Sequence, residues 1–213
     1  MISNKLVIFD ICDTLFKCNT TFEFVKFIKK EGFIDQLLIR MLNNTFIRTL
    51  NVIFFRIFKK DCLRWFIIIS LRGYTYSDLK LYAKAFYQEV LEKEKRDFVH
   101  ILLREFHSQN CELLLMSATV DVVAEEISKQ LGVLKCISST LNYKNGLCTG
   151  TLKFDLLGKK EKYLNLEFDT IVTDNKSDLN LIKIAKNSII ISKNKNVNFW
   201  KNQNIKNINI IKV

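Results

Sequence analysis

The chain opens with an unbroken apolar run that is followed at once by polar residues. Leu6–Phe9 is apolar and partly β-branched, which is typical of a strand buried on both faces. Asp10, Asp13 and Thr14 come directly after it. Because ligands bind at the carboxyl ends of parallel strands, these side chains could face a phosphate or a metal. The alternative for this stretch alone is a surface turn, since Asp and Thr favour turns and helix N-caps.

Apolar residues at helical spacing dominate the next stretch, from Asn19 to about Glu94. We expect Thr20 or Thr21 to cap its first helix and Ser77 its last one. The helices are predicted over residues 22–28, 35–60, 62–71 and 78–91, with a break at Gly73. No strand is expected here, so the stretch is predicted to be an insertion of three or four packed helices.

Strands and helices alternate after Lys95. Strands are expected at 111–116, 135–139, 169–173, 188–192 and 208–213, and helices at 96–109, 121–131, 158–164 and 179–186. Asn145 and Gly146 stand between alternating residues at 141–152, which predicts a hairpin. This alternation indicates an α/β fold in which helices cover both faces of a parallel sheet.

Basic residues outnumber acidic ones, 33 Lys and Arg against 22 Asp and Glu, for a formal net charge of +11. Such an excess favours anionic partners, such as phosphate esters, nucleic acid or an anionic membrane surface. The lysine bias of an A/T-rich genome would produce the same excess, and the lack of proline agrees with that alternative.

Basic and aromatic residues are interleaved within the predicted helical insertion. They are Arg40, Arg48, Arg56, Lys59, Lys60, Arg64 and Arg72, together with Phe46, Phe54, Phe55, Phe58, Trp65 and Phe66. An amphipathic bundle with an aromatic core has this pattern. A cationic, apolar-lined lid over an anionic substrate would have the same pattern, and so would a surface in peripheral contact with an anionic membrane. No RNA-binding motif accompanies the pattern, so we expect no nucleic-acid partner.

The cysteines and the hydropathy exclude several classes of protein. The six cysteines form no C-x-x-C pair, and His100 and His107 do not have zinc-ligand spacing. We therefore expect neither a zinc site nor a disulfide framework, and a reducing, cytoplasmic location. We also expect no cleaved leader, because the first apolar run is short and ends in Asp10. No uncharged run reaches the roughly 18 residues that a membrane span requires.

Polar groups follow three of the predicted strands. The sets are Asp10, Asp13 and Thr14; Ser117 and Thr119; and Asp174 and Asp178, with Lys159 and Lys160 between the last two sets. The ends of parallel strands meet at one edge of a sheet, so these groups are expected to converge. Carboxylates, a hydroxyl and a lysine together suit phosphoryl transfer. Hard oxygen ligands favour Mg²⁺ over zinc.

In order and spacing, these four motifs resemble those of the haloacid dehalogenase-like hydrolases, nearest to their phosphoserine-phosphatase-like branch. That branch has a helical cap between its first and second motifs, and the strand at Leu147–Gly150 also fits it. The resemblance implies a three-layer Rossmann-like core, residues 1–17 and 95–213, and a helical cap, residues 18–94. Arg64-Trp65 and the basic, apolar cap resemble the phosphatidylglycerophosphatase-type members.

The resemblance also implies a role for each site residue. Asp10 matches the nucleophile that becomes an aspartyl phosphate and is also a metal ligand. Thr14, Ser117, Ala118 and Lys160 match phosphate-binding positions, with Lys159 as the alternative lysine. Asp10, Cys12 through its backbone carbonyl, Asp174 and Asp178 match the Mg²⁺ site. From the residues alone, Ser117 could instead cap a helix, Lys160 could be a solvated helix residue, and Asp178 could be an N-cap.

One position departs from the family pattern. The phosphatases carry a second Asp two residues after the nucleophile, as general acid and base, and here that position is Cys12. Asp13 is the adjacent acid and the candidate for this role. The implied function is Mg²⁺-dependent hydrolysis of a phosphomonoester, either a small molecule or a lipid- or sugar-linked one. The alternatives are dehalogenation, carbon–phosphorus cleavage, or a catalytically impaired relative that binds a phosphate ligand or a partner.

Overall fold

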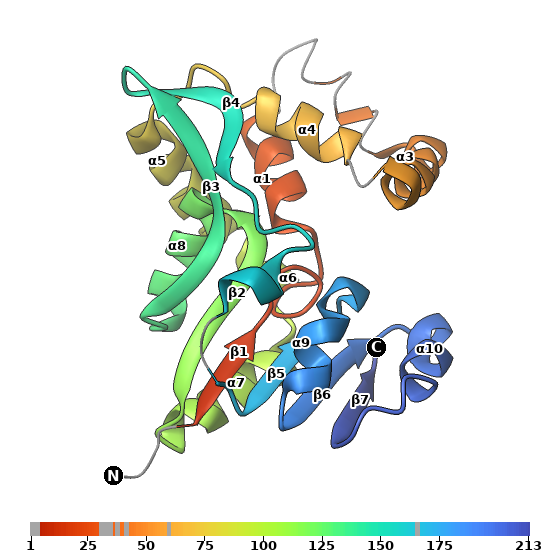
Figure 1. Ribbon diagram of the computed structural model, residues 1–213. Coiled ribbons are helices and arrows are strands. Elements are labelled where there is room, and N and C mark those ends of the chain that lie inside the picture. The colour runs from red at the N-terminus through yellow and green to blue at the C-terminus, as the bar shows by residue number, and fades with distance from the viewer. Residues whose placement is uncertain (1–4, 30–35, 37–38, 41–42, 59–60, 165–166) are drawn as a thin grey trace.

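The computed structural model describes residues 5–29, 36, 39–40, 43–58, 61–164 and 167–213. Within these residues, the strands form one sheet in the order β4-β3-β2-β1-β5-β6-β7 (Figure 1). Their bounds are β1 Leu6–Phe9, β2 Glu112–Val120, β3 Lys135–Lys144, β4 Leu147–Phe154, β5 Thr170–Thr173, β6 Asn187–Ser192 and β7 Ile208–Lys212. All pairs are parallel except β3 with β4. The predicted α/β fold with a mainly parallel sheet is therefore confirmed.

The central strand, β1, is buried on both faces, as its apolar run predicts. Leu6 and Ile8 belong to one hydrophobic cluster, and Val7 and Phe9 to the other. Side chains alternate between the two faces of a strand, so β1 contributes to the core on both sides of the sheet. Each of these side chains stabilises the fold by roughly 1.5–3 kcal/mol. The two clusters fix β1 in place and with it the residue that follows, Asp10.

Helices cover both faces of this sheet. The helices after residue 95 are α7 Asp97–Ser108, α8 Asp121–Leu131, α9 Leu179–Ile184 and α10 Val197–Lys201, with the short 3₁₀ helices η2 Lys160–Tyr163, η3 Lys176–Asp178 and η4 Asn194–Asn196. Helices α7 and α8 pack on one face, and α9 and α10 on the other. Figure 1 shows α9 and α10 beside β5, β6 and β7. The sequence pattern did not predict α10.

The segment between β1 and α7 is helical, as expected. It comprises α1 Thr20–Ile28, α3 Thr45–Phe58, α4 Cys62–Ile69, α5 Tyr76–Phe86, the π-helix η1 Tyr87–Leu91 and α6 Glu92–Glu94. Parts of the predicted helix over 35–60 lie outside the described residues, Lys59 and Lys60 among them. Helices α1 and α5 contact α8, and α4 contacts β4. The division into a core, residues 1–17 and 95–213, and a cap, residues 18–94, remains a prediction.

Several expected details of the insertion are wrong. Asn19, not Thr20 or Thr21, caps α1, and both threonines are buried helix residues. Thr75, not Ser77, caps α5 and forms a capping box with Asp78. Each cap lies one or two residues before the expected one.

The aromatic side chains of the insertion do not all form a core. The exposed fractions are 69% for Phe46, 55% for Trp65 and 43% for Phe66. The side chains of Phe54, Phe55 and Phe58 lie outside the described part. The described helices include none that is long and apolar enough to cross a bilayer.

Three elements of the α/β region differ from the sequence pattern. Strand β2 continues to Val120, so Ser117 and Thr119 lie inside the strand and not in a loop after it. Strand β3 is continuous from Lys135 to Lys144 and changes from parallel pairing with β2 to antiparallel pairing with β4. The helix expected at 158–164 is one turn of 3₁₀ helix, η2.

The hairpin between β3 and β4 turns at the predicted pair. Asn145 and Gly146 have φ values of 52° and 77°, as a type I′ turn requires. Further along β4, Gly150 has φ 75°, and a Cβ atom there would lie 3.0 Å from the backbone of Ile69 in α4. Only glycine fits this contact, which brings α4 close to β4 beside the site described below.

A buried carboxylate, Asp121, joins α8 to β3. It accepts hydrogen bonds from the backbone N–H of Val122 at 3.0 Å and of Leu141 at 3.2 Å. Burial raises the pKa of Asp121 to about 6, above the roughly 3.9 of an unfolded Asp. The ionised form is therefore less favourable in the folded chain than in the unfolded one.

Asp121→Asn should change how stability depends on pH. Because its folded-state pKa is the higher one, the contribution of Asp121 to stability is complete below about pH 4 and is lost as the pH rises through about 6. We expect the free energy of unfolding of the wild type to fall over this interval by up to about 3 kcal/mol more than that of Asp121→Asn. Denaturant unfolding at both ends of the interval measures it, with the exposed Asp97→Asn as control. Equal pH dependence in wild type and Asp121→Asn would contradict the assignment.

Candidate active site

The site is built around Asp10, the first residue after β1. Its backbone N–H donates to the carbonyl of Val172 in β5 at 2.9 Å, which continues the parallel pairing by one residue. Its side chain is 3% exposed, and its Oδ1 accepts from the N–H of Ile11 at 2.8 Å. A carboxylate is thus held at the edge of the sheet between the two central parallel strands.

Lys160, on η2, is the cation that reaches this carboxylate. Its Nζ lies 3.1 Å from Oδ1 of Asp10 and 2.8 Å from Oδ2 of Asp178. The side chain is buried, so the alternative of a solvated helix residue is wrong. The two carboxylates raise the pKa of Lys160 against the effect of burial, and the ammonium therefore stays charged. Burial raises the pKa of Asp10, and Lys160 opposes that rise.

Asp178 supports the lysine. Its Oδ2 accepts from Nζ of Lys160 at 2.8 Å and from the hydroxyl of Thr173 at 2.7 Å. It occupies the N-cap position of α9, but its side chain makes no capping hydrogen bond. The carboxylate is therefore occupied with Lys160 and Thr173.

Asp174 follows β5 and lies close to Asp10. Its N–H donates to the hydroxyl oxygen of Thr14 at 3.0 Å, and that hydroxyl donates back to Oδ1 of Asp174 at 3.2 Å. Burial raises the pKa of Asp174 to about 8, and the negative charges of Asp10 and Asp13 contribute to the rise. The hydroxyl of Thr14 therefore uses both its acceptor and its donor on Asp174, which holds Asp174 in place.

The donor set fits a hard divalent cation. Among the described residues, no three or more His, Cys, Asp or Glu side chains are grouped as a metal site. Asp10 is buried and Asp174 is partly buried, and the charge of Asp10 contributes to the raised pKa of Asp174. A positive charge beside the two carboxylates would favour their ionised forms. Mg²⁺ is commonly held by one or two carboxylates, with water and other oxygens completing its shell. The residues present fit Mg²⁺ and do not fit zinc.

Ser117 and Cys12 belong to a cluster of hydroxyl and thiol groups beside Asp10. The hydroxyl of Ser117 lies 3.1 Å from that of Thr119, which lies 2.8 Å from that of Thr20. Sγ of Cys12 lies 3.1 Å from the Thr20 hydroxyl and 3.3 Å from the Thr119 hydroxyl. Thr119 is in the middle of this arrangement, and Ser117 lies at its edge and does not cap a helix. Burial and the charge of Asp10 raise the pKa of Cys12.

Asp13 is directed elsewhere. It has a positive φ of 53°, its side chain is 37% exposed, and its Oδ1 lies 3.9 Å from Nζ of Lys193. It lines a separate cavity with Asp174, Arg96 and Lys193, whereas Asp10 and Cys12 line another. The positive φ turns the chain between Cys12 and Thr14, and the two acids of the first motif therefore face different cavities.

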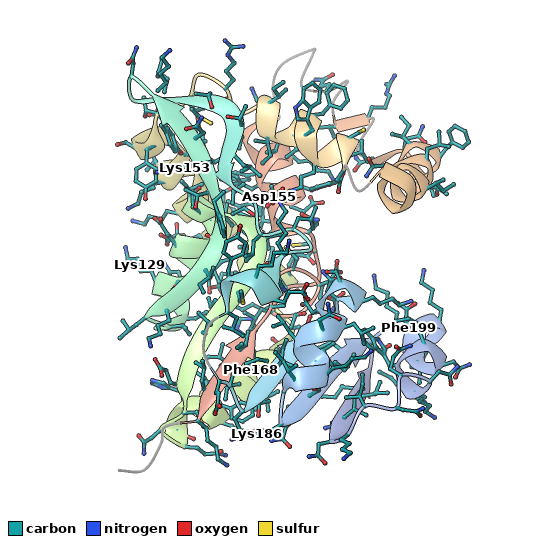
Figure 2. The ribbon with its side chains drawn as sticks, in the orientation of Figure 1. Lys129, Lys153, Asp155, Phe168, Lys186 and Phe199 are labelled. Atoms are coloured by element: carbon teal, nitrogen blue, oxygen red, sulfur yellow. The ribbon has the colours of Figure 1, made fainter. Side chains whose placement is uncertain are left out.

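Arg64, on α4 of the insertion, reaches into the site, and no sequence pattern indicates its partners. Its Nη2 donates to the carbonyl of Ala118 at 2.8 Å, to the Ser139 hydroxyl at 3.1 Å and to Oδ1 of Asp155 at 3.1 Å. Asp155 lies after β4, in the middle of the molecule (Figure 2). The interleaved basic pattern singled out Arg64, but nothing in the sequence marked Asp155, a single acid in a loop.

Two adjoining cavities meet at Arg64. The smaller one, of about 90 Å³, is lined by Asp10, Cys12, Ser117, Ala118 and Lys160, among others. The larger one, of about 960 Å³, is lined by Trp65, Ile68, Leu152, Leu157 and Lys159, among others. Both are bordered by Asp61, Arg64 and Gly158. We call them the nucleophile cavity and the outer chamber.

Comparisons with known proteins agree with this geometry. The family model described as haloacid dehalogenase-like hydrolase matches residues 7–183. A search of the curated proteins found no match.

Solved structures share the fold at low sequence identity. A protein of unknown function from Bordetella pertussis Tohama I has a TM-score of 0.74 at 14% identity, and the match covers 98% of each chain. An apo phosphoserine phosphatase has a TM-score of 0.57 at 17% identity, over 89% of this chain and 86% of that one. Cytosolic 5′-nucleotidase IIIB bound to cytidine has a TM-score of 0.62 at 13% identity, over 98% and 80%.

Proposed function

The chain belongs to the haloacid dehalogenase-like hydrolases, and we propose that it is a Mg²⁺-dependent phosphatase that forms an aspartyl phosphate on Asp10. One observation carries this proposal: a buried carboxylate lies 3.1 Å from a buried lysine ammonium and lines a small cavity. A lysine in that position can stabilise both the nucleophile and the incoming phosphate.

The residues of the site have complementary roles in this proposal. An oxygen of Asp10 attacks phosphorus, and the bond from phosphorus to the leaving oxygen breaks. The hydroxyl of Ser117, the backbone at Ala118 and the ammonium of Lys160 hold the phosphate oxygens, and Asp178 keeps Lys160 in place. Mg²⁺, held by Asp10, Asp174 and the carbonyl of Cys12, would supply further positive charge against the phosphate when bound.

A second step restores the enzyme. The oxygen of a water attacks phosphorus, the bond to Asp10 breaks, and the carboxylate is regenerated while the proton of the water passes to solvent.

The outer chamber supports a substrate with a bulky, partly apolar leaving group. Trp65, Ile68 and Leu152 line it, and it adjoins the nucleophile cavity at Arg64. Two proteins similar in fold, a phosphoserine phosphatase and a 5′-nucleotidase, are named for small phosphorylated molecules. We infer that the substrate here is also a small-molecule phosphomonoester.

The direct test is phosphate release from a panel of phosphomonoesters, with Mg²⁺ and after removal of metal by EDTA. We expect release with Mg²⁺ and a loss of at least about 10²-fold after EDTA, because a metal supplies several kcal/mol to such a reaction. Mg²⁺ added back should restore the rate. Phosphate binding without turnover on the whole panel would instead favour the impaired, phosphate-binding alternative. Release that EDTA does not change would contradict the role of the metal.

A further inference from the structure

Among the residues that the structure describes, no carboxyl group beside Asp10 is free to protonate a leaving group, and Asp13 lines the other cavity. The closest candidates are the thiol of Cys12 and the hydroxyls of Thr20, Thr119 and Ser117, which are engaged with one another at 2.8–3.3 Å. A thiol is a weak hydrogen-bond donor, and hydroxyls are far weaker acids than carboxyls. The cluster therefore contributes contacts to the phosphate instead of a proton.

The carboxyl groups nearby have other partners. Asp178 accepts from Lys160 and Thr173, and Asp174 is paired with Thr14. Among the described residues that line the nucleophile cavity, Asp61 is the one carboxylate besides Asp10.

Asp61 is fixed at the start of α4. Its Oδ1 accepts from the N–H of Arg64 at 2.9 Å and from Nδ2 of Asn51 at 2.8 Å. Asp61 is the acceptor in both hydrogen bonds, as the side chain of an N-cap residue usually is. Its position depends on the helix that it caps and not on the phosphate.

The missing acid has a chemical consequence. When Asp10 attacks phosphorus, the electron pair of the breaking bond leaves with the oxygen of the leaving group. A positioned acid that protonates this oxygen contributes about 10²–10⁴ in rate. Without one, the oxygen departs as an anion and takes its proton from solvent afterwards. Only a leaving group that is stable as an anion departs without this loss of rate.

Resting on the proposed function, we infer that the substrate is an aryl phosphomonoester, whose phenolate leaves without protonation, and not an ester of an aliphatic alcohol. The outer chamber supports this independently, because Trp65, Ile68 and Leu152 offer apolar and aromatic surface to a ring. The lipid- and sugar-linked phosphates expected from the sequence are carried on aliphatic hydroxyls and are therefore poor substrates.

The test is the dependence of kcat/KM on the acidity of the leaving group. Wild-type protein with Mg²⁺ is assayed on substituted phenyl phosphates of graded phenol acidity and on glycerol phosphate. We expect kcat/KM to fall steeply as the phenol becomes less acidic, with glycerol phosphate lowest. Equal rates on aryl and alkyl esters would overturn the inference and leave the phosphatase proposal standing. No release from any member of the series would overturn both.

Two variants of similar size test whether the missing proton donor is a carboxyl group at the position of Cys12. Cys12→Asp supplies a carboxyl where the thiol stands, and Cys12→Asn supplies the same shape without an acid. We expect Cys12→Asp to raise kcat/KM on glycerol phosphate by about 10²–10⁴-fold and to flatten the acidity dependence. Cys12→Asn should do neither, and an equal gain in it would overturn the inference. If Asp61→Asn steepens the dependence of kcat/KM on the acidity of the phenol, Asp61 is the proton donor and the inference fails. The wild-type series remains decisive if Cys12→Asp does not fold.

Discussion

Asp10→Asn is expected to abolish phosphate release, with a fall in kcat/KM of at least about 10⁴-fold. An amide oxygen is a poor nucleophile toward phosphorus. The neutral side chain also no longer attracts the ammonium of Lys160, which lies 3.1 Å from Oδ1 of Asp10 in the wild type. The measurement is phosphate release from phenyl phosphate at saturating Mg²⁺. Residual activity within about tenfold of the wild type would show that Asp10 is not the nucleophile.

Two controls separate chemistry from folding. Asp10→Asn should remain folded, because Asn has the same shape and Lys160 keeps its contact with Asp178. Thermal unfolding and circular dichroism check this. Asp13→Asn is the second comparison, because Asp13 lines a different cavity from Asp10. A small effect agrees with that geometry, and a loss as large as that of Asp10→Asn would show that Asp13 reaches the substrate.

Lys160→Met should have the second largest effect, on both activity and stability. It leaves two buried carboxylates, Asp10 and Asp178, without their shared cation. Removing one partner of a buried ion pair destabilises a protein by about 3–5 kcal/mol. We expect a loss of that size in the free energy of unfolding and a fall of about 10²–10³-fold in kcat, because one stabilising donor to the phosphate is gone. Denaturant unfolding and steady-state kinetics measure the two effects.

Two further variants test whether the loss of stability comes from the buried ion pairs of Lys160 with Asp10 and Asp178. Lys162→Met changes an exposed lysine on the same 3₁₀ turn and should leave stability within about 0.5 kcal/mol. Asp178→Asn combined with Lys160→Met removes one of the two uncompensated charges, so the double variant should be more stable than the sum of the single losses predicts. Strict additivity would contradict the coupling of Lys160 and Asp178.

The sequence pattern predicted the sheet and the convergence of its strand ends because both follow from simple rules. An apolar run such as Leu6–Phe9 has few options other than a buried strand, and parallel strands bring their carboxyl ends to one edge. Asp10 is therefore near Asp174 and Asp178 although it is far from both in the chain. Their chemical roles remain proposals.

Other features depend on contacts that no local pattern contains. The direction of Asp13 follows from one positive φ angle of 53°, which a sequence does not reveal. The contact of Arg64 with Asp155 depends on how α4 packs against β4, and that packing depends in turn on the close approach at Gly150. The extension of β2 through Ser117 arises from pairing with β3, with an irregular register between Ser117 and Val120. Tertiary contacts decided the last two of these features.

The proposed function requires that the phosphoryl group of the substrate passes to Asp10. The most direct measurement is mass spectrometry of the protein after acid quenching during turnover of an aryl phosphate, with the modified residue located in its peptide. We expect one phosphoryl group per chain, on Asp10, that is lost on longer incubation and absent from Asp10→Asn. A phosphoryl group on another residue, or phosphate release with no phosphorylated protein at any quench time, would contradict it.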